Sequence, residues 1–207
     1  MGPPETLVRA LQQRLQLGCF VETGTYRGDT AAWAAGCFPR VVTIELSPAY
    51  HAAAQKRFSS QGKVTTLLGD SKSMLASVLA GLATPALFWL DAHWSGLDTA
   101  GMAAECPLLD ELQVINTSAA SHIVLVDDAR LFAAPPPRPH RAEQWPDLTA
   151  VVNALAAGGR RYVALSDDVL IAVPAAEREF LSSFLQDAAT LAATRQGSGG
   201  WWRKIWQ

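Results

Sequence analysis

Acidic side chains end two apolar stretches of this sequence, and a histidine stands beside the first of them. The stretch from Ala86 to Leu90 runs into Asp91 and His93. The stretch from His122 to Val126 ends in the pair Asp127-Asp128. If both are neighbouring parallel strands, their ends lie about 4.8 Å apart, and three carboxylates crowd one edge of a sheet. Such crowding is costly unless protons or a cation neutralise the charges, so we expect the chemistry at this edge.

A glycine-containing turn stands nearer the N-terminus. Glu22-x-Gly24-x-x-x-Gly28 lies between a strand-like run and a helical pattern, where glycines let the backbone approach a ligand closely. An ordinary turn between a strand and a helix is the alternative interpretation. The pattern is not G-x-G-x-x-G, which argues against a dinucleotide site and hence against a nucleotide-linked oxidoreductase.

Two further strand-like runs end in acids that belong to the same expected edge. Glu45 follows Gly24 by 21 residues, a position from which an acid accepts hydrogen bonds from ribose hydroxyls. Gly69-Asp70-Ser71 ends the next run. Each acid alone is weak evidence, because an exposed side chain near a helix start explains it equally well. Successive strands that all end in acidic or glycine-rich turns are less easily accidental.

The elements that must position these residues alternate along the chain. Strand-like runs cover residues 19–21, 41–46, 64–68, 86–90 and 123–126. Helical patterns cover 6–17, 31–36, 51–58, 72–82, 107–115, 148–157 and 175–195. This alternation predicts βαβ units and a mostly parallel sheet with helices on both faces. Residues 162–165 and 169–173 flank Ser166-Asp167-Asp168 and predict an antiparallel hairpin that completes the sheet.

Composition limits the class of protein. The chain has 207 residues, 49% apolar and 17% charged, which is typical of one globular domain. Its net charge of −2 argues against nucleic acid or an anionic membrane as a partner. No apolar run approaches the roughly 20 residues that span a bilayer, and the first residues lack signal-peptide features. Cys19, Cys37 and Cys106 show no disulfide or metal spacing, so we expect reduced thiols in a cytoplasmic protein.

In their order, these motifs resemble those of class I S-adenosylmethionine-dependent methyltransferases. The matching set is Glu22-x-Gly24-x-x-x-Gly28, Glu45, Gly69-Asp70-Ser71 and Asp91. Leu90-Asp91-Ala92-His93-Trp94, followed by Val126-Asp127-Asp128, is similar to the metal-dependent O-methyltransferases of the catechol and macrocin types. The motifs cover roughly residues 18–132. The resemblance is specific for fold and cofactor and looser for substrate.

Two positions depart from the family pattern. Tyr26 stands where many members carry a middle glycine, which would narrow the loop around the methionine end of the cofactor. The spacing Asp91-Ala92-His93 inserts one residue relative to the catechol type. His93 is therefore not a simple replacement for the catalytic lysine of that type.

The resemblance implies a role for each motif. Glu22, Thr30 and the turn from Gly24 through Thr25 to Gly28 would face the amino acid part of S-adenosylmethionine. Glu45 would hold the ribose, and Asp70 with Ser71 would border the adenine. Asp91 would contact the cofactor and, together with Asp127 and Asp128, would bind Mg²⁺ or a similar divalent ion.

The chemistry of the acidic edge supports the metal assignment independently. Hard cations prefer oxygen ligands, and carboxylates completed by water and substrate oxygens form an ordinary Mg²⁺ site. The alternative is that Asp91 and the pair Asp127-Asp128 cap the helices that follow them. For His93 three roles stay open: general base, further metal ligand, or structural hydrogen-bond donor.

We therefore expect one α/β domain over residues 1–196, with a Rossmann-like, doubly wound, mostly parallel seven-stranded sheet and a C-terminal antiparallel hairpin. The expected reaction is divalent-metal-assisted methyl transfer from S-adenosylmethionine to a hydroxyl of a small molecule. Asp91 and His93 would be its catalytic residues. A catalytically silent S-adenosylmethionine-binding protein of the same fold is the alternative.

Two segments lie outside the motifs. The proline-rich loop 133–146 carries His140, Arg141 and Trp145, and it either covers the substrate or is a plain solvated loop. Residues 197–207 join a Gly/Ser stretch to an aromatic tail with Trp201, Trp202, Ile205 and Trp206. Exposed aromatic patches are usually buried against something. We expect this tail to pack on the domain itself or on a second copy, as in a homodimer.

Overall fold

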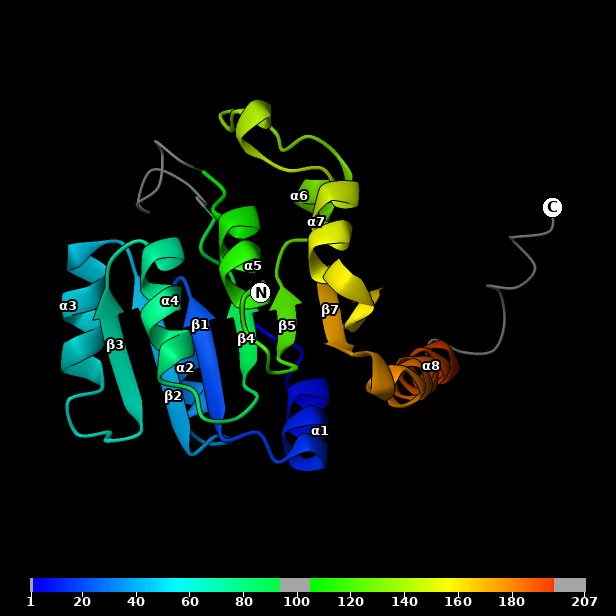
Figure 1. The fold of residues 1–207 in the computed structure, drawn as a ribbon, viewed down its shortest axis with the longest axis horizontal. Helices are drawn as coiled ribbons and strands as arrows, with labels where there is room; N and C mark the ends of the chain where they lie inside the picture. The colour runs from blue at the N-terminus through cyan, green and yellow to red at the C-terminus, as the bar shows by residue number, and fades with distance from the viewer. Residues whose placement is uncertain (1, 94–104, 196–207) are drawn as a thin grey trace.

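One mixed sheet between two layers of helices forms the protein in the computed structural model, which describes residues 2–93 and 105–195 (Figure 1). The strands are β1 Cys19–Thr23, β2 Arg40–Glu45, β3 Val64–Leu68, β4 Leu87–Leu90, β5 Ile123–Val126, β6 Arg161–Ser166 and β7 Val169–Pro174. The α-helices are α1 Glu5–Leu15, α2 Asp29–Ala34, α3 Pro48–Arg57, α4 Ser71–Ala80, α5 Leu108–Asn116, α6 Arg130–Ala133, α7 Leu148–Leu155 and α8 Arg178–Arg195. Short 3₁₀ turns occupy Ala142–Gln144, Ala157–Gly159 and Ala175–Glu177.

The strand order is β3-β2-β1-β4-β5-β7-β6, with β1 to β5 parallel and β7 antiparallel to both β5 and β6. The predicted Rossmann-like seven-stranded sheet with a closing hairpin is confirmed. The order in which strands are added to the sheet reverses between β1 and β4. In open α/β sheets, ligands bind in the crevice beyond the carboxyl ends of the two strands at such a point.

The strand register places the predicted acids side by side. Leu90 pairs with Thr23 on one side and with Val126 on the other. The backbone N–H of Asp91 donates to the Thr23 carbonyl at 3.1 Å, and that of Asp127 donates to the Leu90 carbonyl at 3.2 Å. The hydrogen bonding of the sheet thus continues one residue beyond β4 and β5, and Asp91 and Asp127 lie side by side at the carboxyl ends of these strands.

Two apolar cores cover the two faces of the sheet, because successive strand residues point to opposite sides. Phe88 faces the core under α4, α5 and α7, where Leu112 and Val151 lie buried. Its neighbour Trp89 faces the opposite core, with Leu11 of α1 and Leu181 of α8. Strands buried on both faces form a rigid platform, and the side chains at its carboxyl edge inherit that rigidity.

The element boundaries differ from the expectations mainly at the site. β1 extends to Thr23 and so includes Glu22, and the short helix α6 begins within the turn after β5, where no helix was expected. Four residues are too few for a hydrophobic period to show in the sequence. None of the helices in the two described ranges has the length and apolarity needed to cross a bilayer. The tail beyond residue 196 lies outside the described residues, as do Trp94 and Ser95.

Candidate active site

The glycine turn after β1 is pressed against the backbone that follows β4. Gly24 has φ +87°, and a Cβ on it would lie 2.3 Å from the carbonyl oxygen of Asp91. Gly28 has φ +76°, and a Cβ there would lie 3.0 Å from the Phe58 ring. Only glycine satisfies both the backbone angle and the close approach at position 24. The turn therefore makes close contact between two segments of the chain, and the expected close approach to a ligand stays a prediction.

Glu45 at the end of β2 ties this turn to the start of α3. Its side chain is 7% exposed, and its two oxygens accept the backbone N–H groups of Tyr26 and Ser47, each at 2.8 Å. Each oxygen keeps capacity for a second donor. Tyr26 has φ 48°, and its ring packs against Tyr50 of α3 with centroids 4.9 Å apart. The residue that replaces the middle glycine thus rests on a neighbouring helix.

Buried hydroxyls surround Glu22 in the middle of β1. Thr43 donates to its carboxylate at 2.5 Å, and Thr43 and Thr25 share a hydrogen bond of 2.6 Å. Burial raises the pKa of Glu22 to about 8, and the charge of Asp91 adds to the rise, while the hydroxyls of Thr43 and Thr30 oppose it. Of these groups, Thr43 was not predicted, because a threonine inside a strand carries no motif. The network holds an acid that gains from a cation beside it.

The acid after β3 has a structural partner. Asp70 caps α4 by accepting the backbone N–H of Lys72 at 3.2 Å, while Ser71 is buried behind it. Glu111 of α5, which the sequence analysis missed, lies in the same layer and is 1% exposed. Burial raises the pKa of Glu111 to about 7, although the nearby hydroxyls of Ser71 and Thr23 lower it. Its Oε1 atom is buried and makes no hydrogen bond within the described part of the chain.

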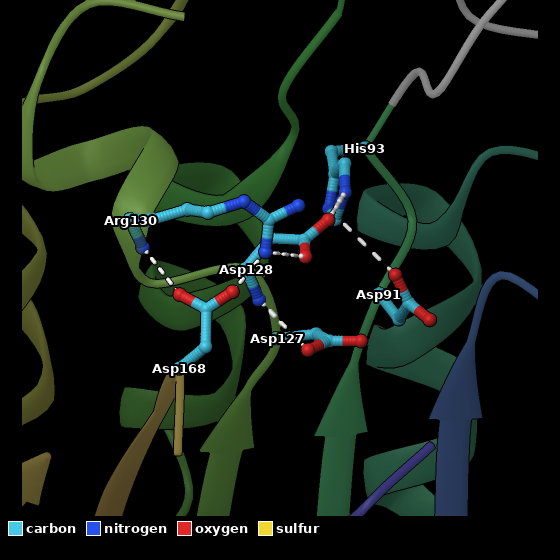
Figure 2. A network of polar contacts seen from close by, with 6 residues as sticks. All are labelled: Asp91, His93, Asp127, Asp128, Arg130 and Asp168. Carbon is cyan, nitrogen blue, oxygen red and sulfur yellow. Dashed lines mark hydrogen bonds and ion pairs between the residues drawn. The ribbon is translucent and has the colours of Figure 1, made fainter. Parts of the chain in front are cut away.

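The acidic edge predicted from the sequence is present (Figure 2). His93 Nε2 lies 2.7 Å from Asp128 Oδ2, and its Nδ1 lies 3.8 Å from Asp91 Oδ1. Asp127 accepts the backbone N–H of Asp128 at 2.8 Å. Asp128 itself has φ 54°, a left-handed conformation that turns its side chain out of the strand direction and toward His93. The edge is therefore a set of carboxylates arranged around one imidazole.

The charges at this edge are unequally compensated. Burial raises the pKa of Asp91 to about 7. The nearby His93 lowers this pKa, and the charges of Asp127 and Asp128 raise it further. Burial also raises the pKa of Asp127. The hydrogen bond from His93 lowers the pKa of Asp128 to about 2. Burial disfavours the charged ring of His93, but its bond to Asp128 and the three aspartate charges outweigh this and raise its pKa.

Arg130 and Asp168 extend the edge, and neither was predicted. Arg130 Nη1 lies 2.6 Å from Asp128 Oδ1 and also pairs with the Asp168 carboxylate (Figure 2). The backbone N–H of Arg130 donates to Asp168 Oδ1 at 2.7 Å. Asp168 stands in the β6–β7 turn, 38 residues away. The turn of the closing hairpin thus holds the cation that faces Asp128.

A divalent ion does not find a preformed three-ligand site here. Within residues 2–93 and 105–195, no group of three or more His, Cys, Asp or Glu side chains is arranged to hold a metal. Asp128 is already paired with His93 and Arg130. The capping alternative is not found for α6, which has no side-chain cap. The carboxylates are the right chemical type for Mg²⁺, but their arrangement as described is that of a hydrogen-bonded acid–imidazole cluster.

An aromatic side chain closes the site above His93. Trp145 is 8% exposed, and its ring lies 5.4 Å from the His93 ring. Its indole N–H donates to Glu105 at 2.8 Å. His93 also lines a small pocket with Leu90, Ala92, Cys106, Pro107, Leu108, Glu111, Val126 and Phe132. Trp145 itself belongs to the buried apolar core on this side of the sheet. That the loop 133–146 covers a substrate stays a prediction, and Glu105 was missed.

Comparison with solved structures identifies proteins that share this fold. No protein-family model matches the chain, and no curated protein matches its sequence. Among solved structures, a candidate caffeoyl-CoA O-methyltransferase from Staphylococcus aureus is similar at 14% identity, with a TM-score of 0.61 over 84% of this chain and 85% of that one. The S-adenosylhomocysteine-bound methyltransferase PaMTH1 from Podospora anserina matches at 20% identity and TM-score 0.54, over 82% and 76%.

A third similar structure is the sugar N-methyltransferase KedS8 from a Streptoalloteichus species. It matches at 14% identity and TM-score 0.54, over 82% of this chain and 85% of that one. The resemblance of the motifs to S-adenosylmethionine-dependent methyltransferases is thus confirmed at the level of the fold. At these identities the likeness carries no substrate with it.

Proposed function

We propose that the chain is an S-adenosylmethionine-dependent methyltransferase that acts on a hydroxyl of a small molecule. The observation that carries the proposal is the contact of the Gly24 turn with the Asp91 backbone, directly beside the His93–Asp128 pair. A ligand in the crevice between β1 and β4 would meet both features at once. Methyl transfer requires this proximity, because donor and acceptor must be held in line as a near-attack pair.

The acids around the Gly24 turn favour a cationic cofactor. Glu22 is buried and Asp91 is partly buried, and their removal from water makes both hold protons more tightly than ordinary carboxyls. S-adenosylmethionine carries a sulfonium and an ammonium group, and either would stabilise the ionised carboxylates. In this assignment the turn faces the amino acid part, Glu45 accepts the ribose hydroxyls with its remaining lone pairs, and Asp70 with Ser71 borders the adenine.

The imidazole of His93 is placed to act as the general base. With Nε2–H donated to Asp128, the Nδ1 atom is the one left to accept a proton from the acceptor hydroxyl. Asp128 orients the ring and stabilises the imidazolium that forms. Because the aspartates raise the His93 pKa, the unprotonated base is populated only above that raised value. Methyl transfer should therefore accelerate as the pH rises, and at higher pH than it would with a histidine of ordinary pKa.

Mg²⁺ assistance remains a separate proposal. A bound divalent ion would lower the pKa of the acceptor hydroxyl as a Lewis acid, and Asp91 and Asp127 would be its first ligands. The pairing of Asp128 with His93 and Arg130 does not fit this role as it stands. No step is therefore assigned to a metal. Methyl transfer measured with and without EDTA separates the two routes.

Calorimetry tests the proposal directly. S-adenosylmethionine and S-adenosylhomocysteine should both bind, and Glu45→Ala should weaken binding about ten- to hundredfold through the loss of charge-assisted hydrogen bonds. Glu143→Ala, an exposed glutamate far from this turn in sequence, is the matched control. Tight NAD binding with no response to either adenosyl compound would overturn the proposal.

Transfer itself separates an enzyme from a silent binding protein. Labelled methyl groups from S-adenosylmethionine should appear on a member of a panel of catechols, phenols and sugars. Cofactor binding without transfer to any such acceptor would favour the silent S-adenosylmethionine-binding protein. Full activity in EDTA would leave the aspartates as partners of His93 rather than metal ligands.

A further inference from the structure

Glu105 is a buried acid whose hydrogen-bond partners, within the described residues, come from one distant segment. Its carboxylate is 1% exposed. Oε2 accepts the indole N–H of Trp145 at 2.8 Å, and both oxygens lie 3.1 Å from the backbone N–H of Arg141. His140 Nδ1 lies 3.3 Å from Oε2. These donors outweigh the cost of burial and lower the pKa of Glu105.

The same segment also binds the backbone of Glu105. The Glu105 N–H donates to Gln144 Oε1 at 2.9 Å. Between Ala133 and Asp147, the buried residues are Pro136 and Trp145, and Trp145 packs in the apolar core. Polar contacts with Glu105 therefore add to the packing of Trp145 in holding segment 140–145 in place.

Trp145 connects this contact to the site. Its indole ring lies 5.4 Å from the ring of His93, 5.3 Å from that of His140 and 5.9 Å from that of Phe132. The His93 side chain is 7% exposed, with Asp128 on one ring nitrogen and Asp91 near the other. The aspartates lie at the edge of the imidazole, and the indole packs beside the ring.

We propose that Glu105 is a positioning residue of the active site, which holds Trp145 beside His93 and so keeps the imidazole on Asp128. The inference deepens the proposed function and rests on His93 belonging to that site. Glu105 itself touches neither cofactor nor acceptor in this assignment. Its effect passes through the indole N–H, so a change at Glu105 should be felt at His93.

Chemical modification of the histidines tests the proposal without an acceptor. Diethyl pyrocarbonate labels accessible imidazoles, and peptide mass spectrometry reports each of the 4 histidines separately. Glu105→Gln keeps the shape of the side chain but removes its charge. His93 should then react about ten- to hundredfold faster, the factor expected for losing hydrogen bonds to a charged group. Glu143→Gln, an exposed glutamate of the same segment, should leave the His93 rate unchanged.

A double substitution tests whether the effect passes through the indole. Trp145→Ala should raise the His93 rate as Glu105→Gln does. The double variant should react no faster than Trp145→Ala alone, because the two residues act as one unit. Faster labelling of His140 with an unchanged His93 rate would mean that Glu105 only anchors the loop, and would overturn the proposal.

Folding failure and loss of the proposed function are distinguishable outcomes. If Glu105→Gln does not fold by circular dichroism, Trp145→Phe serves instead, since it keeps a ring beside His93 but lacks the N–H. An unchanged His93 rate in that variant overturns the proposal equally. If the unaltered protein binds no S-adenosyl compound while the labelling results hold, only the proposed function fails.

Discussion

Glu22 is a residue that should favour the binding of a cationic ligand while destabilising the free protein. Its folded-state pKa of about 8 lies above the ordinary value of 4.5, so between these values the folded protein binds more protons than the unfolded chain. Stability from this group is therefore present at low pH and falls as the pH rises from about 4.5 to about 8. The acid destabilises the free protein at neutral and alkaline pH, and a cationic ligand would relieve that cost.

Glu22→Gln should consequently stabilise the free protein in a pH-dependent way. At pH 8 the free energy of unfolding should rise by about 2–4 kcal/mol, and at pH 5 it should change by less than about 1 kcal/mol. Urea unfolding at both values measures this, and Asp187→Asn on exposed α8 is the control. The same substitution should weaken S-adenosylmethionine binding. An equal change at both pH values would mean that Glu22 is already ionised in the free protein.

His93→Ala tests the base assignment. Methyl transfer should fall by about 10²–10⁴-fold if the imidazole takes the acceptor proton, while cofactor affinity stays within a few-fold because the Gly24 turn and Glu45 are untouched. Initial rates with labelled cofactor measure the first quantity and calorimetry the second. A loss of less than tenfold would assign His93 a supporting role beside Asp91 and Asp128.

At the residue scale, the sequence predicted acids that follow strands and missed acids that pair across the fold. Asp91, Asp127 and Asp128 were predictable because parallel strands end at one edge. Arg130 meets Asp168 across 38 residues, and Glu105 meets Trp145 across 40. No spacing rule connects such positions, since the loops that carry them are placed by the fold as a whole.

At the scale of elements, the alternation of strands and helices was sufficient for the architecture. Periodicity located the strands of the sheet, and the family resemblance implied its Rossmann-like, doubly wound form. The strand order itself was not predicted and comes from the structure. Helix α6 was missed because its four residues lie in the turn after Asp128, where the left-handed backbone and the contact with Asp168 decide the conformation. Tertiary contacts, rather than local preference, determine such short elements.

The junction of β1 and β4 should be the most sensitive point between elements. Gly24→Ala places a Cβ 2.3 Å from the Asp91 carbonyl oxygen at φ +87°, so the turn or the end of β4 must move. We expect a loss of about 3 kcal/mol or more in unfolding free energy and no measurable cofactor binding.

Gly18→Ala is the matched control, because a Cβ there meets nothing within 4 Å. Its unfolding free energy should change by less than about 1 kcal/mol. Denaturant unfolding of both variants gives the comparison. A Gly24→Ala protein as stable as Gly18→Ala would show that the turn adapts without cost.

At the scale of the whole molecule, the sequence leaves the C-terminal tail as a prediction. Helix α8 lies beside β7, and its Leu181 is buried in the core (Figure 1). Residues 197–207 beyond it lie outside the described residues. Deleting them should lower the melting temperature or shift the mass in sedimentation, because aromatic patches are usually buried. A deletion that changes neither quantity would leave the tail without a docking role.

The strand order also determines when each strand can pair with its neighbours during synthesis on the ribosome. β1 to β4 are contiguous in sequence and in the sheet, so the side proposed for the cofactor can pair as soon as residue 90 is available. β5 then waits with one open edge until β7 arrives at residues 169–174. During that interval the nascent chain exposes an unpaired apolar strand beside the acidic turn at 127–128, a state prone to aggregation. A pause in synthesis between β5 and β7 should therefore lower the yield of active protein unless a chaperone covers the open strand.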